Sequence, residues 1–287
     1  MRVLVTGSNG QLGVEIVRLF SSKGHEVIGL NRIQLDITDG KTCIDVIAKL
    51  QPDTIIHCGA YTAVDNAETD QDSAYLVNAF GTRNIAVAAE CVKAKMCYIS
   101  TDYVFDGTSS KPYHEYDNTN PLTVYGKSKR AGEQLVQSLS SQWFIVRTSW
   151  VFGGSGNNFV ETMLKLGEER DYLKVVNDQW GSPTYTCDLA LFLEELTRTE
   201  KYGIYHASNT GICTWYEFAS AIFEQANFSV TIEPCTTEQF PRPAPRPRYS
   251  ALEPMALRVN GFSPFRHWRD ALQDYINKLG MNKHGGA

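Results

Sequence analysis

Short apolar runs alternate with helix-like segments along the first half of the chain. The apolar runs are Val3–Val5, Glu26–Leu30, Thr54–Cys58, Met96–Ser100 and Trp143–Thr148. The segments between them, at 14–20, 41–50, 71–93 and 125–139, are predicted to be helices. Because parallel neighbours need crossover connections, this alternation predicts an α/β protein with a Rossmann-type, doubly wound parallel sheet and helices on both faces.

The composition excludes several classes of protein. The 287 residues are 43% hydrophobic, and 27 Lys+Arg against 32 Asp+Glu leave a net charge of −5. An acidic chain of this size can bury a core but lacks the basic face that nucleic acids or anionic membranes require. No apolar run approaches the ~18 residues of a membrane span, and residues 1–10 lack the apolar region of a secretory signal, so we expect a cytoplasmic protein.

Cysteine and histidine spacing gives no sign of a metal site. The seven cysteines form no CxxC pair, and the six histidines form no HExxH motif. We therefore expect neither a disulfide framework nor a bound metal.

Three glycines follow the first apolar run. Gly7, Gly10 and Gly13 lie three residues apart, between the first predicted strand and the first predicted helix. Without side chains, the backbone can turn sharply and approach a pyrophosphate, which then meets free N–H groups and the positive end of the helix dipole. A turn that binds nothing would use the same glycines, but their place at the start of a βαβ unit favours a dinucleotide site.

The end of the second predicted strand bears on which dinucleotide binds. An acidic residue about 20 positions after the glycines receives the ribose hydroxyls of NAD, whereas an arginine can accept the 2′-phosphate of NADP. Arg32 stands nineteen residues after Gly13, which favours NADPH, with NADH as the alternative. Asp36 and Ile37 follow, and Asp36 is predicted to lie near the adenine amino group. The alternative is that Arg32 is a solvent-exposed loop residue that binds no phosphate.

A tyrosine and a lysine share one face of the helix predicted at 125–139. Tyr125 and Lys129 are four residues apart. A phenol is a weak acid at neutral pH, and a nearby ammonium is expected to lower its pKa toward the working range. Thr101, Asp102 and Tyr103 follow the fourth predicted strand, and ligands of open α/β sheets bind outside the carboxyl ends of the strands. The two groups are therefore predicted to face one crevice.

The strand and helix rhythm loosens after about residue 150, so a second, smaller lobe is expected. A further strand is predicted at Leu173–Val176, whereas four prolines make 240–249 a loop. We assign residues 1–150 and about 173–200 to a dinucleotide-binding domain. Residues of about 151–172 and 201–280 are assigned to a C-terminal substrate-binding lobe.

Several motifs together resemble the extended short-chain dehydrogenase/reductases and, more narrowly, the dTDP-4-dehydrorhamnose reductase family. They lie at residues 6–13, 59–68, 100–107, 125–129, 147–152 and 178–184, within a likeness that runs from residue 1 to about 280. The resemblance implies NADPH-dependent reduction of the C4 keto group of dTDP-4-dehydro-L-rhamnose to dTDP-L-rhamnose, a sugar donor for cell-wall polysaccharide.

The resemblance also implies roles for particular residues. Tyr125 would be the catalytic acid, Lys129 would tune it and hold the nicotinamide ribose, and Thr101 would hydrogen-bond the reacting oxygen. The predicted cofactor-binding residues are Gly7, Asn9, Gly10, Gln11, Leu12, Gly13, Arg32, Asp36, Ile37, Gly59, Ala60, Tyr61, Asn78, Tyr125 and Lys129. The predicted substrate-binding residues are Thr62, Val64, Thr101, Asp102, Tyr103 and Trp150.

The substrate implied is a nucleotide sugar, whose diphosphate needs local positive charge in an acidic chain. Arg242, Arg246 and Arg248 in the proline-rich loop are candidates, and an exposed basic linker is the alternative. Some family members are magnesium-bridged dimers. Under the resemblance, Glu15 is a candidate for one of their carboxylates, but the sequence gives it no partners. The magnesium bridge is therefore not carried over to this chain, no metal is predicted, and a homodimer is an open possibility.

Two other functions are compatible with the same scaffold. A sugar-nucleotide epimerase or dehydratase would retain its NAD, and dehydratases follow the Thr-Asp pair with a glutamate where this chain has Tyr103. An NADP-binding regulatory subunit, similar to the β subunit of methionine adenosyltransferase, would bind the dinucleotide without turnover. The presence of Thr101, Tyr125 and Lys129 favours an enzyme.

Overall fold

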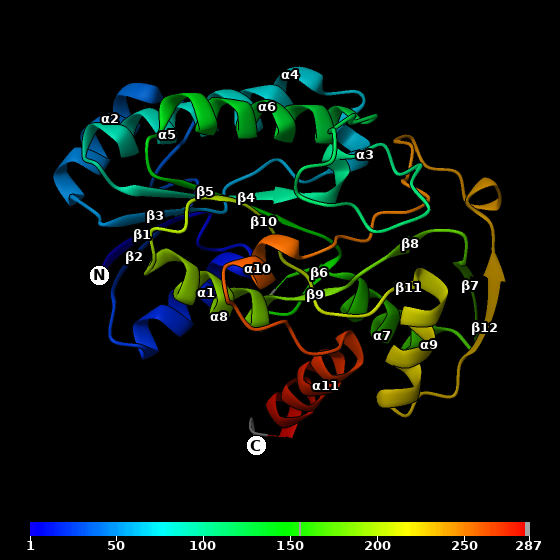
Figure 1. Cartoon of the computed structure of the whole chain (residues 1–287). Helices are drawn as coiled ribbons and strands as arrows, with labels where there is room; N and C mark the ends of the chain where they lie inside the picture. Colours follow the sequence, from blue (N-terminus) through cyan, green and yellow to red (C-terminus); the bar gives the residue numbers. More distant parts are fainter. Residues whose placement is uncertain (155, 285–287) are drawn as a thin grey trace.

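Six parallel strands form the central sheet, and helices cover both of its faces (Figure 1). The computed structural model describes residues 1–154 and 156–284. Side chains are described for all of these residues except 281–284. The strands are β1 (Arg2–Thr6), β2 (Glu26–Leu30), β3 (Thr54–His57), β4 (Lys95–Thr101), β5 (Trp143–Thr148) and β10 (Gly203–His206). Their order is β10-β5-β4-β3-β1-β2, and all neighbours pair in parallel. The predicted doubly wound Rossmann-type sheet is confirmed.

The two faces of the sheet bury different side chains of the same strands. Val3 and Val5 pack with the helices α1 (Gln11–Ser22) and α8 (Thr186–Thr197). Leu4 packs on the other face, which is covered by α2 (Gly40–Leu50), α5 (Thr82–Cys91) and α6 (Val124–Leu139). Since successive side chains of a strand point to opposite faces, burial on both faces explains the unbroken apolar run.

The predicted helix at 71–93 is interrupted. The structure has α4 (Gln71–Tyr75), a π-helical segment η1 (Leu76–Gly81) and then α5. A π-turn adds one residue per turn, so a search for 3.6-residue spacing does not detect it. The short helix α3 (Val64–Ala67) precedes this region.

A second lobe packs beside the carboxyl ends of the central strands. Its elements are β6 (Val151–Phe152), α7 (Phe159–Glu169), β7 (Tyr172–Val176), β8 (Trp180–Gly181), β9 (Thr184–Tyr185), β11 (Cys213–Thr214), α9 (Trp215–Gln225), β12 (Thr231–Cys235) and α11 (Trp268–His284). The short elements η2 (Asp102–Val104), η3 (Thr237–Gln239) and α10 (Met255–Val259) complete the fold. The second lobe has a hydrophobic core of its own, which includes Phe152, Phe218, Ile222, Trp268 and Leu272.

Two segments exchange places relative to the predicted domain boundaries. β7, predicted in the large domain, pairs with β12 in a two-stranded sheet of the small lobe. The sixth central strand is β10, from the segment assigned to the small lobe. β7 alternates exposed and buried residues, as a strand covered on one face does, whereas five of the six residues of β5 are buried.

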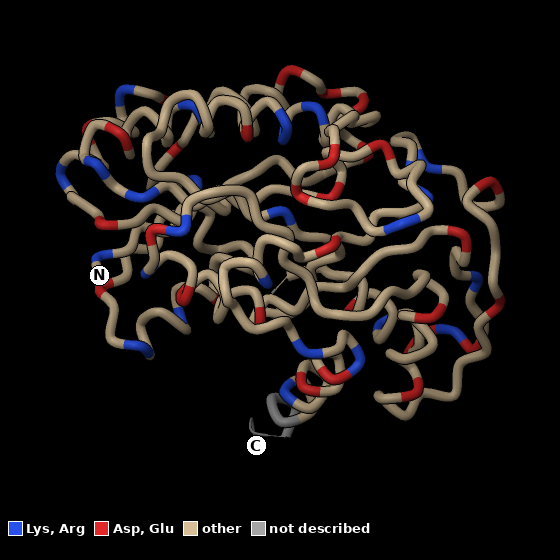
Figure 2. The backbone as a smooth tube through the Cα atoms, in the orientation of Figure 1, with Lys and Arg blue, Asp and Glu red and all other residues tan. Residues whose placement is uncertain are grey.

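Charged residues of both signs are interspersed over the outer helices and loops, as Figure 2 shows, while the central strands carry few of them. Among the helices described, none is both long and apolar enough to cross a bilayer.

Candidate active site

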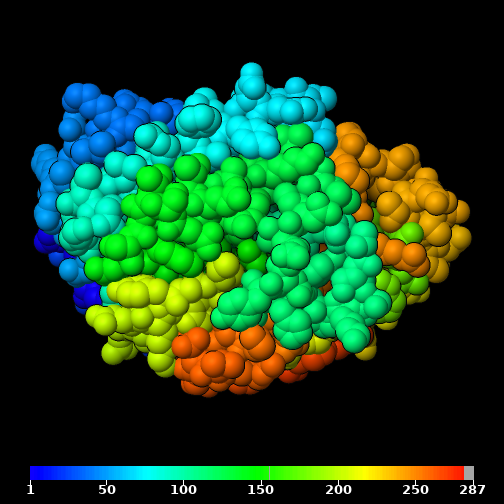
Figure 3. All heavy atoms as spheres, turned by 45° about the horizontal axis from the view of Figure 1, so that its top comes forward, coloured from blue at the N-terminus to red at the C-terminus, as the bar shows by residue number. Residues whose placement is uncertain are grey.

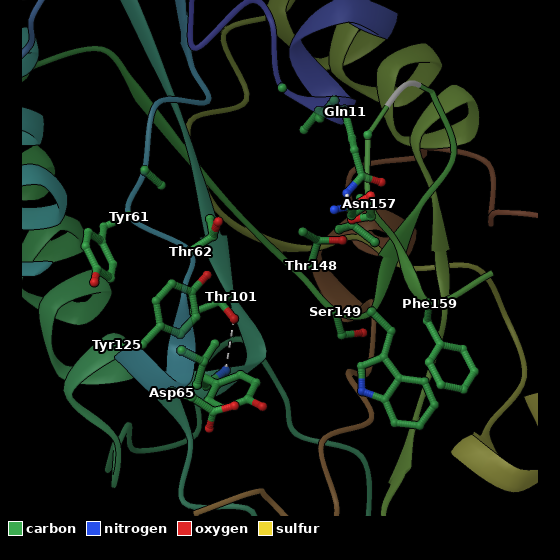
Figure 4. A pocket seen from close by; sticks show the side chains of 18 of the residues that line it. Gln11, Tyr61, Thr62, Asp65, Thr101, Tyr125, Thr148, Ser149, Asn157 and Phe159 are labelled. Atoms are coloured by element: carbon green, nitrogen blue, oxygen red, sulfur yellow. Dashed lines mark hydrogen bonds between the residues drawn. The ribbon is translucent and has the colours of Figure 1, made fainter. Parts of the chain in front are cut away.

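A cleft of about 1430 Å³ lies between the two lobes at the carboxyl ends of the central strands. It is lined by every residue predicted for cofactor or substrate except Asn78 and Arg248. The strand order reverses next to β1, because β2 lies on one side of β1 and the chain then crosses to β3 on the other side. This switch point opens into the cleft. Figure 4 shows Tyr61, Thr101 and Tyr125 on one side of the space, with Gln11, Asn157 and Phe159 on the other.

The glycine turn places the start of α1 at the cleft. Gly7 has φ +65°, and a Cβ there would lie 2.7 Å from the Gly59 backbone nitrogen. A Cβ on Gly13 would lie 2.3 Å from the Gly7 carbonyl oxygen, so α1 could not approach the turn. Gly10 has the room that the other two lack, because its Cβ would meet only the Gly7 oxygen, at 3.4 Å. Free amides at the first turn of α1 can therefore meet an anion in the cleft.

A buried polar group supports the floor of this turn. The Thr6 hydroxyl lies 2.6 Å from His57 Nδ1, and His57 Nε2 lies 3.2 Å from the Thr82 hydroxyl. Burial lowers the pKa of His57 to about 3, which keeps the ring neutral. His57 was not predicted from the sequence, although a histidine at the end of a buried strand indicates that polar partners lie nearby.

Asn78 lies beneath the cleft and not in its lining. Its side-chain oxygen accepts from the Tyr61 amide at 2.8 Å, and its side-chain nitrogen donates to the Tyr61 carbonyl at 3.0 Å. The same nitrogen donates to the Ser128 hydroxyl at 3.0 Å. Asn78, seated by the π-helical segment η1, therefore holds the strand-end loop of Tyr61 against α6.

The loop after β2 presents Arg32 and Asp36 to the cleft. The Asn31 side chain accepts from the Ile33 amide at 2.9 Å and closes the turn that carries Arg32. The Thr38 amide and hydroxyl donate to Asp36 at 3.0 and 2.8 Å. These two bonds hold the pKa of Asp36 below its ordinary value, so it is an anion at neutral pH. Arg32 is exposed and has room to meet a phosphate.

Tyr125 and Lys129 lie in the first two turns of α6. The Thr123 hydroxyl caps the helix by accepting from the Gly126 amide at 3.0 Å. A Cβ on Gly126 would lie 2.2 Å from the Tyr103 carbonyl oxygen, so this glycine lets the start of α6 pack against η2. The Tyr125 ring meets the edge of Tyr103 at a centroid distance of 5.6 Å.

The pKa directions at this pair differ from the sequence expectation. Desolvation raises the pKa of Tyr125 to about 12, although the Thr101 hydroxyl acts to lower it. Burial lowers the pKa of Lys129 to about 7, with the Glu133 carboxylate opposing. Lys129 Nζ donates to the Ile99 carbonyl at 2.7 Å and lies 4.0 Å from the Tyr98 ring centroid. The ammonium is thus engaged elsewhere, and the phenol stays protonated at neutral pH.

Thr101 and Asp102 are hydrogen-bonded at the end of β4. The Thr101 hydroxyl donates to Asp102 Oδ1 at 2.9 Å and accepts from the Tyr103 amide at 3.2 Å (Figure 4). Burial raises the pKa of Asp102 to about 6, while hydrogen bonds from Ser250 and Thr101 act to lower it. The Thr101 hydroxyl is therefore fixed on the same side of the cleft as Tyr125.

A buried ion pair joins α6 to the central sheet. Glu133 accepts from Arg147 Nε at 2.8 Å and Nη2 at 2.9 Å, and from the Ser100 hydroxyl at 2.7 Å. Glu133 and Arg147 are both almost fully buried. Glu133 follows Lys129 by one turn of α6, and its partners Arg147 and Ser100 lie on β5 and β4. These contacts therefore fix the distance between the sheet and the helix face that carries Tyr125 and Lys129. This ion pair was not predicted from the sequence, because the two residues do not belong to one motif of fixed spacing.

The small lobe contributes an aromatic wall. Trp150 stacks on Trp215 with centroids 3.6 Å apart, and Phe159 lies 4.5 Å from Trp215. Trp150 has φ +48°, and a Cβ on Gly181 would lie 2.6 Å from its ring. Trp215 and Phe159 were missed because their distance from the predicted site in sequence gives no signal.

The proline-rich loop brings two of its three arginines to the cleft. Arg242 and Arg246 line it, whereas the lining does not include Arg248, whose carbonyl accepts from the Trp180 amide at 2.8 Å. The Arg242 guanidinium lies 4.6 Å from the Phe240 ring centroid. Thr62 and Val64 face the same cleft from the segment after β3.

Within the described residues, no group of three or more histidines, cysteines or carboxylates is placed to hold a metal ion. Glu15 is bonded by Arg18, with Nε and Oε2 3.3 Å apart.

Comparison with known proteins gives one consistent result. The family model for the RmlD substrate binding domain matches residues 1–281. The spore coat polysaccharide biosynthesis protein SpsK of Bacillus subtilis is 46% identical, over 96% of this chain and 97% of its own length. The dTDP-4-dehydrorhamnose reductase of Streptomyces griseus is 43% identical, over 97% and 94%. The crystal structure of dTDP-4-dehydrorhamnose reductase from Bacillus anthracis in complex with NADP has 46% identity and a TM-score of 0.95, covering 96% of this chain and 99% of that one. The chain therefore belongs to the RmlD family, that of the dTDP-4-dehydrorhamnose reductases.

Proposed function

We propose that this chain reduces the C4 keto group of dTDP-4-dehydro-L-rhamnose with NADPH and forms dTDP-L-rhamnose. The observation that carries the proposal is that one cleft joins the glycine turn, Arg32 and the group of Tyr125, Lys129 and Thr101. The names of the relatives support the same reaction, and the Bacillus anthracis structure contains NADP.

The residues present fit a dinucleotide. Gly7 and Gly13 let the turn pack against Gly59 and the start of α1, where a Cβ would clash, and the first turn of α1 lines the cleft with free amides. Arg32 would meet the 2′-phosphate, and Lys129 would hold the nicotinamide ribose. When bound, NADPH supplies the hydride that reaches C4 of the sugar.

The side chains of this protein supply the proton and the positioning. As the C4 oxygen gains negative charge, the Tyr125 hydroxyl donates its proton to it, which the raised pKa of the phenol keeps available at neutral pH. The Thr101 hydroxyl hydrogen-bonds the same oxygen. The aromatic wall of Trp150, Trp215 and Phe159 faces this point from the small lobe and excludes water from it.

Reduction is favoured over elimination by the residue that follows Asp102. A dehydratase needs a second acid or base there, but this position is Tyr103, whose pKa burial raises further above its ordinary value. The experiment that tests the proposal is a turnover screen of nucleotide-linked 4-keto sugars with NADPH and with NADH. We expect NADPH oxidation with dTDP-4-dehydro-L-rhamnose. Tight NADPH binding without oxidation by any keto sugar would instead indicate a regulatory subunit.

Arg32 provides a test of cofactor choice. Replacing it by alanine removes the guanidinium that acts on the Asp36 carboxylate at the cleft, so NADPH affinity should fall by about tenfold while NADH affinity changes by less than about twofold. The measurement is titration of each dinucleotide by fluorescence. Equal losses for both would remove Arg32 as the reader of the 2′-phosphate.

We further infer that the larger lobe binds the dinucleotide and the smaller lobe binds the nucleotide sugar, with β7 in the smaller lobe and β10 in the larger. A homodimer and a cytoplasmic location stay predictions. Sedimentation of the purified chain and fractionation of the cell are their tests.

A further inference from the structure

One loop of the small lobe crosses to the large lobe. We name residues 240–249 the strap. Its end is tied down by the backbone, since the Tyr249 amide donates to the Gly107 carbonyl at 3.1 Å and the Ser250 amide donates to the Trp180 carbonyl at 2.7 Å. In Figure 1 the strap passes beside α3, and Figure 3 shows the orange chain of this region against the cyan part of the large lobe.

Asp65 on α3 holds the middle of the strap. Its Oδ2 lies 2.8 Å from Arg246 Nη2, and its Oδ1 accepts from the Ala244 amide at 3.2 Å. Arg246 Nη1 donates to the Ala244 carbonyl at 3.3 Å, which closes a ring of three bonds. The two charged side chains are 28% and 19% exposed, so the pair is shielded from most of the solvent.

The same contact determines where the Arg246 charge lies. Arg246 and Asp65 both line the cleft, and Arg246 stands between Pro245 and Pro247, which restrict the backbone on either side. A guanidinium has five N–H donors, and the contacts to Asp65 and Ala244 leave others for a ligand. Both Asp65 oxygens accept hydrogen bonds, so its charge is offset locally.

We propose that Asp65 is a positioning residue for the nucleotide sugar: it clasps the strap across the cleft and presents Arg246 to the substrate diphosphate. This rests on the proposed function. The clasp is formed in the free protein, so binding of the substrate does not have to order the loop. The entropy that ordering would cost is therefore retained as substrate affinity, and the rate of the chemical step is unaffected.

The first test is Asp65→Asn. The two contacts go to different oxygens of Asp65, and asparagine replaces one of these oxygens by an NH₂ group, which faces a donor and cannot accept from it. We expect KM for the nucleotide sugar to rise about tenfold, with kcat and NADPH affinity within about twofold of the unmodified chain. Asp45→Asn is the matched control, because it breaks the exposed Lys41–Asp45 pair on α2. The proposal is overturned if Asp65→Asn leaves KM unchanged, or if kcat falls about tenfold while KM does not change.

A double variant separates clasping from a general effect on folding. Arg246→Gln should itself raise KM, and Asp65→Asn should add less than about twofold to it, because the group that Asp65 positions is then gone. Additive effects of the two changes would mean that Asp65 does not act through Arg246, and would overturn the proposal.

Hydrogen exchange tests the clasp independently of the reaction. In the free protein, the peptide covering 236–249 should exchange several-fold faster in Asp65→Asn than in the unmodified chain or in Asp45→Asn. Unchanged exchange overturns the clasp even if the chain reduces the sugar. If the unmodified chain reduces no keto sugar, the proposed function fails. Titration with dTDP alone then decides the clasp, which requires weaker dTDP binding in Asp65→Asn.

Discussion

At the scale of single residues, the protonation states in the cleft suit reduction. Tyr125 has its pKa raised by desolvation, so the neutral phenol carries the proton that the product oxygen needs. We predict that Tyr125→Phe lowers kcat by about 10²–10⁴-fold with NADPH affinity retained, because only the donated proton is lost. Single-turnover kinetics and a dinucleotide titration measure the two effects. Turnover near that of the unmodified chain would refute the assignment of Tyr125.

Asp102 makes the stability of the protein depend on pH. Burial raises its folded-state pKa to about 6 from 3.8, so the folded chain binds more protons than the unfolded chain between these values. Its contribution to stability is therefore present at low pH and falls as pH rises through that window. Asp102→Asn does not titrate. The free energy of unfolding of the variant, relative to the unmodified chain, should rise by about 2 kcal/mol from pH ~4 to pH ~7.

Urea unfolding at a series of pH values measures this difference. The comparison with the unmodified chain is needed because buried His57, with its lowered pKa, acts in the opposite sense below its ordinary value of 6.5. A difference that does not change with pH would show that Asp102 titrates normally.

At the scale of elements, the glycine turn depends on two close approaches and not on three. Gly13→Ala would place a Cβ 2.3 Å from the Gly7 oxygen and push α1 away from β1. We predict a loss of about 2–4 kcal/mol in the free energy of unfolding, together with weaker NADPH binding. Gly10→Ala, with its nearest contact at 3.4 Å, is the control and should cost about 1 kcal/mol or less. Equal costs for the two changes would contradict this account.

Element prediction from the sequence succeeded where one local pattern decides the structure. Five of the six central strands and α6 were predicted to within a residue or two, because burial on both faces gives an apolar run and an amphipathic helix gives regular spacing, whereas the sixth central strand, β10, was not predicted. The helix predicted at 71–93 contains the π-helical segment η1, which local spacing does not encode. β7 has strand character, but which sheet it joins depends on β12, more than fifty residues away.

At the scale of the whole molecule, the two lobes have separate cores, so damage to each should affect a different ligand. Phe218 is fully buried in the small lobe, and Phe20 is fully buried against the central sheet. Phe218→Ala should lose about 3–5 kcal/mol of stability and weaken nucleotide-sugar binding more than NADPH binding. Phe20→Ala should also lose stability, but it should weaken NADPH binding more than nucleotide-sugar binding. Calorimetric titration of both ligands at low temperature measures this. The same order of loss in the two variants would contradict the assignment of ligands to lobes.

The sequence by itself determined the doubly wound sheet, the glycine turn and the placement of Tyr125 and Lys129 on one helix, because each depends on residues close together along the chain. Only the tertiary structure decided that Lys129 faces Ile99, that Asn78 lies beneath the cleft, and that Asp65 meets Arg246. These contacts join residues far apart in sequence. Their distances and desolvation, which set protonation and charge placement, exist only once the two lobes are packed together.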